Sequence, residues 1–208
     1  MGRSNSPDTT GRLVLASASP RRAELLRQAG VDVEIRPCPE PEPVRKPASV
    51  TIEMWPVCLA HYKASAVRQS IGTRKSKLPT IAVIGADTIV ELNGRIINKA
   101  ASAAHAREIL RSLAGRKHRV ITGLAVIAGE ETHLLCATAV CRMRRLSPAS
   151  LERYIAGGLW RGKAGAYGIQ DADDPLVELV SGDITTVMGL PMPPLLDLLA
   201  RIRCQLRS

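Results

Sequence analysis

Residues 80–98 read TIAVIGADTIVELNGRIIN, and this stretch decides the fold of the chain. Apolar, mostly β-branched residues lie on both sides of Asn93-Gly94, and this dipeptide between two apolar runs is a strong signal for a β-hairpin. A second strand pair is predicted at about residues 120–128 and 132–143, with its turn at Gly129-Glu130. The middle of the chain is therefore predicted to contribute two hairpins to a sheet.

An aspartate, Asp87, interrupts the first apolar run, although aspartate is depleted in strands. A two-residue turn pairs Asp87 with Ala100 and Lys99 with Thr88, which puts both charged groups at the open end of the hairpin. Strict alternation sends Asp87 and Lys99 to opposite faces unless a bulge or fraying interrupts the ladder. Because a buried carboxylate is costly unless it is paired or binds a metal ion, we favour a functional Asp87 over an edge-strand salt bridge.

Helices are expected around these strands. A short strand at residues 13–16 leads into a helix with Ser19 at the N-cap, Pro20 in the first position and Gly30 at its end. Further helices are expected at about 55–69, from 102 to before 115, at 148–155 and at 195–206, with loops at 36–49 and 72–79. These elements predict an α/β (mixed α+β) domain over residues 11–208, with a partly antiparallel sheet, after a disordered tail at 1–10.

The composition favours one globular domain that binds polyanions. The 208 residues are 45% hydrophobic, enough for a sizeable core, and the net charge is +10 with a pI near 9.9. Nucleic acid, a membrane surface and phosphorylated small molecules are candidate partners. Aromatic residues make up only 2%, which argues against stacking on many bases, and no apolar run is long enough to span a membrane.

The cysteine pattern indicates a reducing environment. The five cysteines are odd in number and form no CxxC pair. A disulfide or zinc framework is therefore disfavoured, and we expect mostly buried thiols in a cytoplasmic protein.

The loop from Ser17 to Arg22 is a candidate anion site. A strand ends, a short turn follows, and the N–H groups at the start of a helix are free to bind an anion. Arg21 and Arg22 lie in the first turn, where cations oppose the helix dipole, so a bound phosphate chain explains them better than solvated surface arginines do.

A third candidate segment is the glycine-rich stretch at residues 162–170, GKAGAYGIQ. Three glycines around Lys163, Tyr167 and Gln170 are typical of a close-fitting loop, either a plain turn or a ligand contact. The Walker pattern GxxxxGK[ST], the HExxH pattern and the GxSxG pattern are absent from the sequence, and the four histidines show no metal-binding spacing.

Taken together, four collinear motifs resemble the Maf family. They are LASASPRR at 15–22, GADT at 85–88 with Asn93-Gly94 and Lys99, KAGAYGIQ at 163–170, and Gly182-Asp183 followed by VMGLP at 187–191. The resemblance runs from about residue 12 to 199. It implies an elongated mixed α/β fold with a central cleft, shared with inosine triphosphatases, and often a homodimer.

The implied activity is hydrolysis of a nucleoside triphosphate to the monophosphate and pyrophosphate with a divalent cation, Mg²⁺ or Mn²⁺. The resemblance makes Asp87 the proton acceptor, and it implies a metal site at Asp87 and Glu42, with Glu40 as the alternative to Glu42. Substrate-binding or specificity residues are implied at Ser17, Arg21, Arg22, Lys63, Thr88, Lys99, Lys163 and Gln170.

The residues at 21, 88 and 170 are similar to those of the subgroup that acts on dTTP and UTP. The sequence departs from the usual family pattern at Gly162, Ala100, Ile184 and Thr186. A pyrophosphatase for 7-methyl-GTP, a nucleic-acid-binding protein and a non-catalytic regulator of cell division remain alternatives, although a stable nucleic-acid or membrane partner is not expected.

Overall fold

The computed structural model describes residues 12–72, 80–170 and 176–205. The predicted tail at 1–10 and nearly all of the predicted loop at 72–79 lie outside these ranges. The strands are β1 (Arg12–Leu15), β2 (Glu34–Ile35), β3 (Thr80–Leu92), β4 (Arg95–Ile97), β5 (Lys117–Ala128), β6 (Glu131–Met143) and β7 (Val177–Ser181). The helices are α1 (Pro20–Gln28), α2 (Met54–Gly72), α3 (Ala103–Leu113), α4 (Pro148–Ala156), α5 (Ile184–Met188) and α6 (Met192–Gln205).

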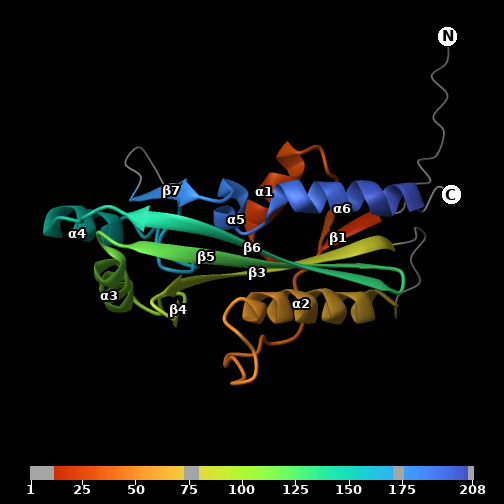
Figure 1. Cartoon of the computed structure of the whole chain (residues 1–208), viewed down its shortest axis with the longest axis horizontal. Coiled ribbons are helices and arrows are strands. Elements are labelled where there is room, and N and C mark those ends of the chain that lie inside the picture. Colours follow the sequence, from red (N-terminus) through yellow and green to blue (C-terminus); the bar gives the residue numbers. More distant parts are fainter. Residues whose placement is uncertain (1–11, 73–79, 171–175, 206–208) are drawn as a thin grey trace, which may run out of the picture.

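The described strands form one mixed sheet in the order β2-β1-β3-β5-β6-β7, with β4 paired to β3. Strand β1 is parallel to β2 and β3, whereas β3, β5, β6 and β7 pair in an antiparallel manner. The long strands β3, β5 and β6 run along the length of an elongated molecule (Figure 1). The prediction of a mixed, partly antiparallel sheet with flanking helices is therefore confirmed.

Helices cover both faces of this sheet (Figure 1). Helix α2 packs on one face through a cluster that includes Ala60, Ala64 and Val67, together with Val83 of β3. Helices α1 and α6 pack on the other face, where Leu26 and Leu195 belong to a separate cluster. Alternation along β3 thus sends odd-numbered residues toward α2 and even-numbered residues toward the opposite face.

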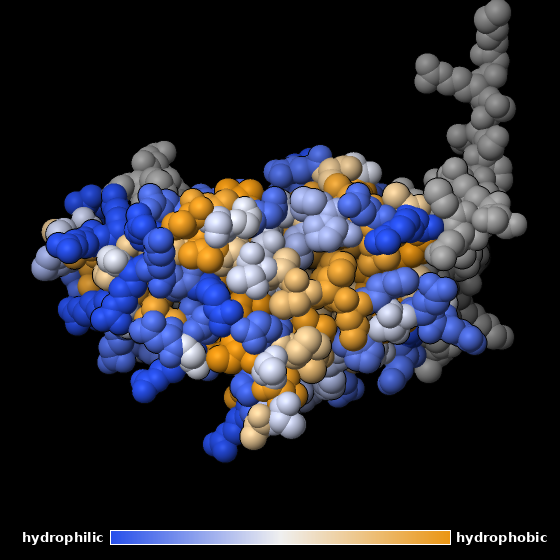
Figure 2. Space-filling model, in the orientation of Figure 1, coloured by the Kyte–Doolittle hydropathy of each residue, from blue (hydrophilic) through white to orange (hydrophobic). Residues whose placement is uncertain are grey.

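Helices α3 and α4 close one end of the molecule, and a third cluster that contains Leu110, Leu151 and Tyr167 fills that end. Hydrophilic side chains gather over this end in Figure 2, whereas apolar side chains are concentrated over the middle of the same face. The loop at 162–170 lies against this cluster, because Ala166 and Tyr167 are buried in it.

Most of the predicted elements are present. Asn93 and Gly94 both have left-handed φ angles, 52° and 78°, as a tight hairpin turn requires. Ser19, Ser102 and Ser147 are N-caps, as their positions predict. The last helix, however, begins at Met192 rather than at 195, because its two prolines lie in the first turn, where they are tolerated. Helix α5 was not predicted.

The predicted cross-strand pairs Asp87–Ala100 and Thr88–Lys99 are wrong. The hairpin register holds from Leu92↔Arg95 to Val90↔Ile97, and there the ladder ends. The chain then leaves β3, and Lys99 forms an isolated bridge with Ala164 of the glycine-rich loop. The partner of Asp87 is Gly123 on β5, so Asp87 lies on a strand with neighbours on both edges and not on an edge strand.

The described cysteines Cys38, Cys58, Cys136 and Cys141 form no disulfide. The expectation of mostly buried thiols is wrong for this group: only Cys141 is buried, and Cys58 and Cys136 are exposed. Among the described helices, none combines the length and the apolar character that crossing a membrane requires.

Candidate active site

The site lies at a gap where one edge of β3 has no described strand paired to it. Strand β1 pairs with β3 up to Ile84, and β4 pairs with it from Val90 onward. Since β5 occupies the opposite edge, β1 and β4 share one edge of β3 and leave residues 85–89 without a described strand partner there. Asp87 and Thr88 lie in this gap and project to opposite faces of the sheet.

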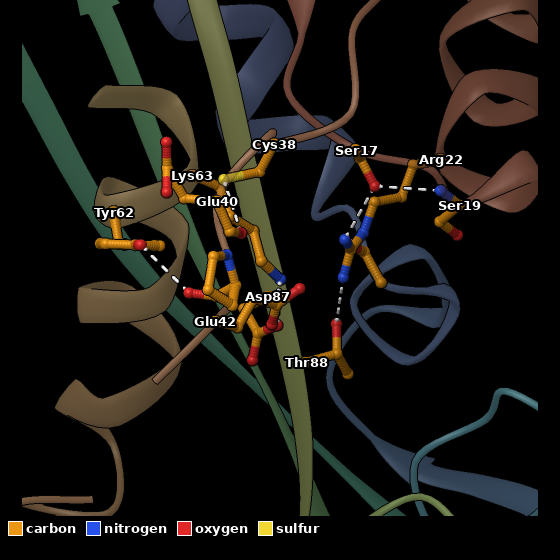
Figure 3. A network of polar contacts seen from close by, with 12 residues as sticks. Ser17, Ser19, Arg22, Cys38, Glu40, Glu42, Tyr62, Lys63, Asp87 and Thr88 are labelled. Atoms are coloured by element: carbon orange, nitrogen blue, oxygen red, sulfur yellow. Dashed lines mark hydrogen bonds and ion pairs between the residues drawn. The ribbon is translucent and has the colours of Figure 1, made fainter. Parts of the chain in front are cut away.

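On the α2 side of the gap, one lysine contacts two carboxylates (Figure 3). The Nζ atom of Lys63 lies 2.6 Å from Oδ1 of Asp87 and 3.0 Å from Oε2 of Glu42. The Lys63 side chain is 8% exposed and that of Asp87 14%. The burial of this ammonium is compensated by the two carboxylates, which is the usual condition for a buried charge.

Two glycines and two alanines allow α2 to come this close to the sheet. A Cβ atom added at Gly85 would lie 2.1 Å from the Ala60 carbonyl oxygen, and one added at Gly123 would lie 2.2 Å from the Val57 nitrogen. No larger residue fits at either place, because the obstacle is helix backbone. The short distance between Lys63 and Asp87 depends on this close packing.

The loop that precedes α2 carries Glu42. The Tyr62 hydroxyl donates to the Pro41 carbonyl at 3.1 Å, which ties the loop to the helix next to Lys63 (Figure 3). Glu42 lines the cavity of the site, whereas Glu40 is not among its lining residues. The geometry favours Glu42 over Glu40 as the cleft carboxylate.

On the other side of the gap, Ser17 and Arg22 order the loop that precedes α1. The Oγ atom of Ser17 accepts hydrogen bonds from the Ser19 N–H at 3.2 Å and from Nη1 of Arg22 at 3.1 Å. Ser19 is the N-cap of α1, yet its own side chain makes no capping hydrogen bond. Arg21 and Arg22, in the first turn of α1, line the cavity, and the Ser19 side chain does not cap their N–H groups.

Arg22 is a buried arginine with neutral hydrogen-bond partners. Besides Ser17, its guanidinium donates to the Gly189 carbonyl at 2.7 Å and to Thr88 Oγ1 at 3.2 Å. Burial lowers the pKa of the Arg22 guanidinium, and the negative charge of Asp87 opposes this shift. Arg22 thus joins three segments, while the neighbouring Arg21 is exposed at the cavity.

The glycine-rich loop completes the site. The bridge between Lys99 and Ala164 brings Lys99 beside Lys163, which is buried. The Tyr167 hydroxyl and Nε2 of His118 on β5 lie 2.6 Å apart, and both side chains are buried. Burial raises the pKa of Tyr167 and lowers that of His118 to about 4. His118, to which the sequence assigned no role, holds this loop on the sheet.

The predicted site residues surround one cavity of about 470 Å³. Its lining includes Ser17, Arg21, Arg22, Glu42, Lys63, Asp87, Thr88, Lys99, Lys163 and Gln170. Arg161, which the sequence reasoning missed, is also there, and its guanidinium carbon lies 4.9 Å from the centre of the Trp160 ring. Its position next to the glycine-rich motif is the only signal that points to it. Six cationic side chains against two acidic ones suit a polyanionic ligand.

No group of three or more metal-ligating side chains is found among the residues that the structure describes. Mg²⁺ commonly binds one or two carboxylates and completes its shell with water and substrate phosphates. Asp87 and Glu42 meet that requirement, since they approach each other around one lysine and Oδ2 of Asp87 makes no described contact.

These features define an α/β protein with a cavity lined by six cationic side chains, in which one carboxylate, Asp87, is paired with a buried lysine. The chain belongs to the family described as Maf-like protein, whose family model matches residues 12–202. It is 36% identical over 194 residues to a dTTP/UTP pyrophosphatase of Gloeobacter violaceus, covering 92% of this chain and 96% of that relative. Proteins of the same name are 39% identical in Aromatoleum aromaticum (87% and 90% covered) and 40% identical in Cereibacter sphaeroides (90% and 93% covered).

Proposed function

We propose that the protein is a nucleoside triphosphate pyrophosphatase that hydrolyses dTTP and UTP to the monophosphate and pyrophosphate. The observation that carries this proposal is the pairing of Asp87 with Lys63 at 2.6 Å in a cavity lined by six cations. The relatives named dTTP/UTP pyrophosphatase support the reaction and the pyrimidine substrates.

In the proposed reaction, a water molecule attacks the α-phosphorus of the triphosphate. Asp87 accepts a proton from this water while the oxygen of the water bonds to phosphorus. The bond between the α-phosphorus and the bridging α–β oxygen breaks. The electron pair of that bond leaves with pyrophosphate. Lys63 keeps the Asp87 carboxylate in place through its hydrogen bond and compensates its charge.

The phosphate chain is held by residues from three segments. Ser17 and the N-terminus of α1 bind one part, and Lys99 and Lys163 bind another. Arg22 contributes positive charge from its buried position. This division of the cations is our proposal for how the cavity accommodates several negative charges.

A divalent cation, Mg²⁺ or Mn²⁺, is proposed as the cofactor, with Asp87 and Glu42 as its protein ligands. When bound, it supplies neutralisation of charge on the phosphates. Arg21, Thr88 and Gln170 are proposed to select the base. Gln170 has both a donor and an acceptor, which suits the carbonyl and N–H edge of a pyrimidine.

The test is a panel of dTTP, UTP, CTP, GTP and 7-methyl-GTP with the purified protein, scored separately for pyrophosphate and orthophosphate. We expect pyrophosphate from dTTP and UTP with Mg²⁺ or Mn²⁺, loss of release on adding a chelator, and recovery on restoring the metal. Orthophosphate as the first product would contradict the reaction. Higher kcat/KM for GTP or 7-methyl-GTP than for dTTP and UTP would contradict the substrate assignment.

The remaining partner assignments are also proposals: a cytoplasmic protein, a possible homodimer, and no stable nucleic-acid partner. Light scattering of the purified protein measures the oligomer. Titration with duplex DNA at increasing salt measures nucleic-acid binding, and tight binding at low salt with a steep loss at high salt would contradict the last assignment.

A further inference from the structure

A chain of hydrogen bonds runs from Arg22 through two threonine hydroxyls to a main-chain carbonyl. Nη2 of Arg22 donates to Thr88 Oγ1 at 3.2 Å, and the Oγ1 atoms of Thr88 and Thr122 lie 2.9 Å apart. Oγ1 of Thr122 donates to the Thr186 carbonyl at 2.7 Å. Thr122 is fully buried, and no role in the reaction has been given to it so far.

The two ends of this hydrogen-bond chain, a guanidinium and a carbonyl, determine which hydroxyl donates in each hydrogen bond between them. A guanidinium has only donors and a carbonyl has only acceptors. The single hydroxyl proton of Thr122 lies toward the Thr186 carbonyl. The contact between the two threonines must therefore use the proton of Thr88, which leaves Thr88 with a lone pair and no proton to offer elsewhere.

Thr88 lines the cavity, so this lone pair is what it presents to a ligand. Ser17 is arranged in the opposite way: its oxygen accepts from Ser19 and from Arg22, and neither contact uses its proton. Ser17 is thus free to donate to a phosphate oxygen, whereas Thr88 would meet a phosphate with lone pair against lone pair.

We propose that Thr122 is a positioning residue that fixes Thr88 as a hydrogen-bond acceptor toward the substrate, and that Thr88 thereby receives the imide N–H of a uracil or thymine base. This inference rests on the proposed function, because it names how the same site recognises its pyrimidine. Cytosine carries an unprotonated ring nitrogen in place of the imide N–H, and this nitrogen repels an acceptor. Thr122 acts through Thr88 and does not touch the substrate.

The decisive variant is Thr122→Val, which keeps the shape of the side chain and removes its hydroxyl. The Thr186 carbonyl retains a hydrogen bond from the Gly189 N–H at 3.2 Å, so the fold is expected to persist. The Thr88 hydroxyl is then free to rotate and donate. Thr122→Ser restores the hydroxyl, and Thr132→Val makes the same change at an exposed position of β6.

The measurement is the ratio of kcat/KM for UTP to that for CTP. We expect Thr122→Val to lower this ratio about fivefold, the effect of one neutral hydrogen bond, through KM rather than through kcat for UTP. Thr122→Ser and Thr132→Val should keep the wild-type ratio. An unchanged ratio in a folded Thr122→Val protein, or a fall in kcat alone, overturns the inference.

Binding separates this inference from the proposed function. The affinities of wild type and Thr122→Val for the α,β-methylene analogues of UTP and CTP, measured by calorimetry, require no turnover. A wild type that binds the uridine analogue better but releases no pyrophosphate contradicts only the function. A wild type that does not distinguish the two analogues, or binds neither, overturns the inference.

Discussion

At the scale of single residues, Lys63 links the two carboxylates of the site. Its ammonium is 2.6 Å from Asp87 and 3.0 Å from Glu42, and it holds together two acidic groups from distant parts of the sequence. Removing one member of a buried charged group leaves the others uncompensated, which usually costs more than the group contributes when intact. Variants that keep the volume of the side chain are therefore the informative ones.

We predict that Asp87→Asn lowers kcat by at least about a hundredfold, because the amide cannot accept the proton of the attacking water and general-base catalysis contributes about 10²–10⁴-fold. The fold should persist, since asparagine fills the same volume and its amide oxygen still accepts from Lys63. Pyrophosphate release and thermal unfolding are measured on the same preparation.

Asp197→Asn, on the exposed face of α6, is the matched control and should retain the wild-type rate. Near-normal turnover of Asp87→Asn together with a lowered Tm would mean that Asp87 is only a structural ion-pair partner. That result would refute the mechanism.

At the scale of elements, the packing of α2 on the sheet determines whether Lys63 reaches Asp87. We predict that Gly85→Ala lowers the free energy of unfolding by about 1–3 kcal/mol or more, because its Cβ meets helix backbone that has no rotamer with which to avoid it. Activity of the folded fraction should also fall, since α2 must move outward. Urea unfolding and turnover measure the two effects.

Gly157→Ala is the control for this change. Gly157 has a right-handed helical backbone, and the nearest atoms to an added Cβ lie at 3.6 Å, an ordinary contact. Its stability should equal or exceed that of the wild type. If Gly85→Ala proves as stable as Gly157→Ala, the close approach of α2 is not required.

The link between β5 and the glycine-rich loop predicts a pH dependence. His118 has a folded-state pKa of about 4 because of burial, below its ordinary value of 6.5. As pH falls, the unfolded chain takes up this proton first, so the stability that depends on neutral His118 is present above about pH 6.5 and is lost toward pH 4. Between pH 7 and pH 5 the expected loss is about 2 kcal/mol.

His118→Gln should remove this part of the pH dependence, because glutamine can hydrogen-bond to Tyr167 but does not titrate. Urea unfolding at pH 7 and pH 5 measures the difference between wild type and variant. His61→Gln, which removes an exposed ring on α2, is the control. Equal losses of stability in wild type and His118→Gln would refute the assignment to His118.

The elements that sequence predicts well are those with local signals. The Asn-Gly hairpin and the serine N-caps are examples, because a turn and a helix start depend on neighbouring residues. Helix α5 lacks such a signal: its ITTVM sequence is rich in β-branched residues that favour strands, and its conformation depends on the Asp183 cap and on tertiary contacts.

The residues of the site could be predicted from the sequence, but their relative positions in space could not. The motif resemblance named the residues that line the cavity, yet the hairpin register placed Asp87 and Lys99 on opposite faces. Their approach depends on where β4 ends and on the bridge between Lys99 and Ala164, and a contact between segments so far apart leaves no local trace. The same holds for the His118–Tyr167 pair and for Thr122.

At the scale of the whole molecule, the cavity spans parts that belong to different apolar clusters. Its walls come from the loop before α1, from α2, from β3 and from the glycine-rich loop at the α3–α4 end. A nucleotide bound in this cavity as proposed would contact all of them, so binding should stabilise the native state as a unit.

We predict that α,β-methylene dTTP at about a hundred times its Kd adds roughly 2.7 kcal/mol of stability. For a chain of this size that corresponds to a rise in Tm of about 5–10 °C. Differential scanning fluorimetry with Mg²⁺ measures the shift. Thymidine, which lacks the phosphates, should give a much smaller rise at the same concentration, and an equal rise would contradict phosphate binding by the cationic lining.

The stretch of the β3 edge without a described strand partner also presents main-chain groups that mutation of side chains does not remove. The Ile84 carbonyl accepts from the Ala16 N–H on that edge, and by alternation the peptide groups of Ala86 and Thr88 face the same way, into the gap. Main-chain carbonyl acceptors survive every substitution, and main-chain N–H donors survive every substitution except proline. This main-chain edge of β3 is therefore insensitive to most side-chain substitutions, because the groups that face the gap belong to the backbone.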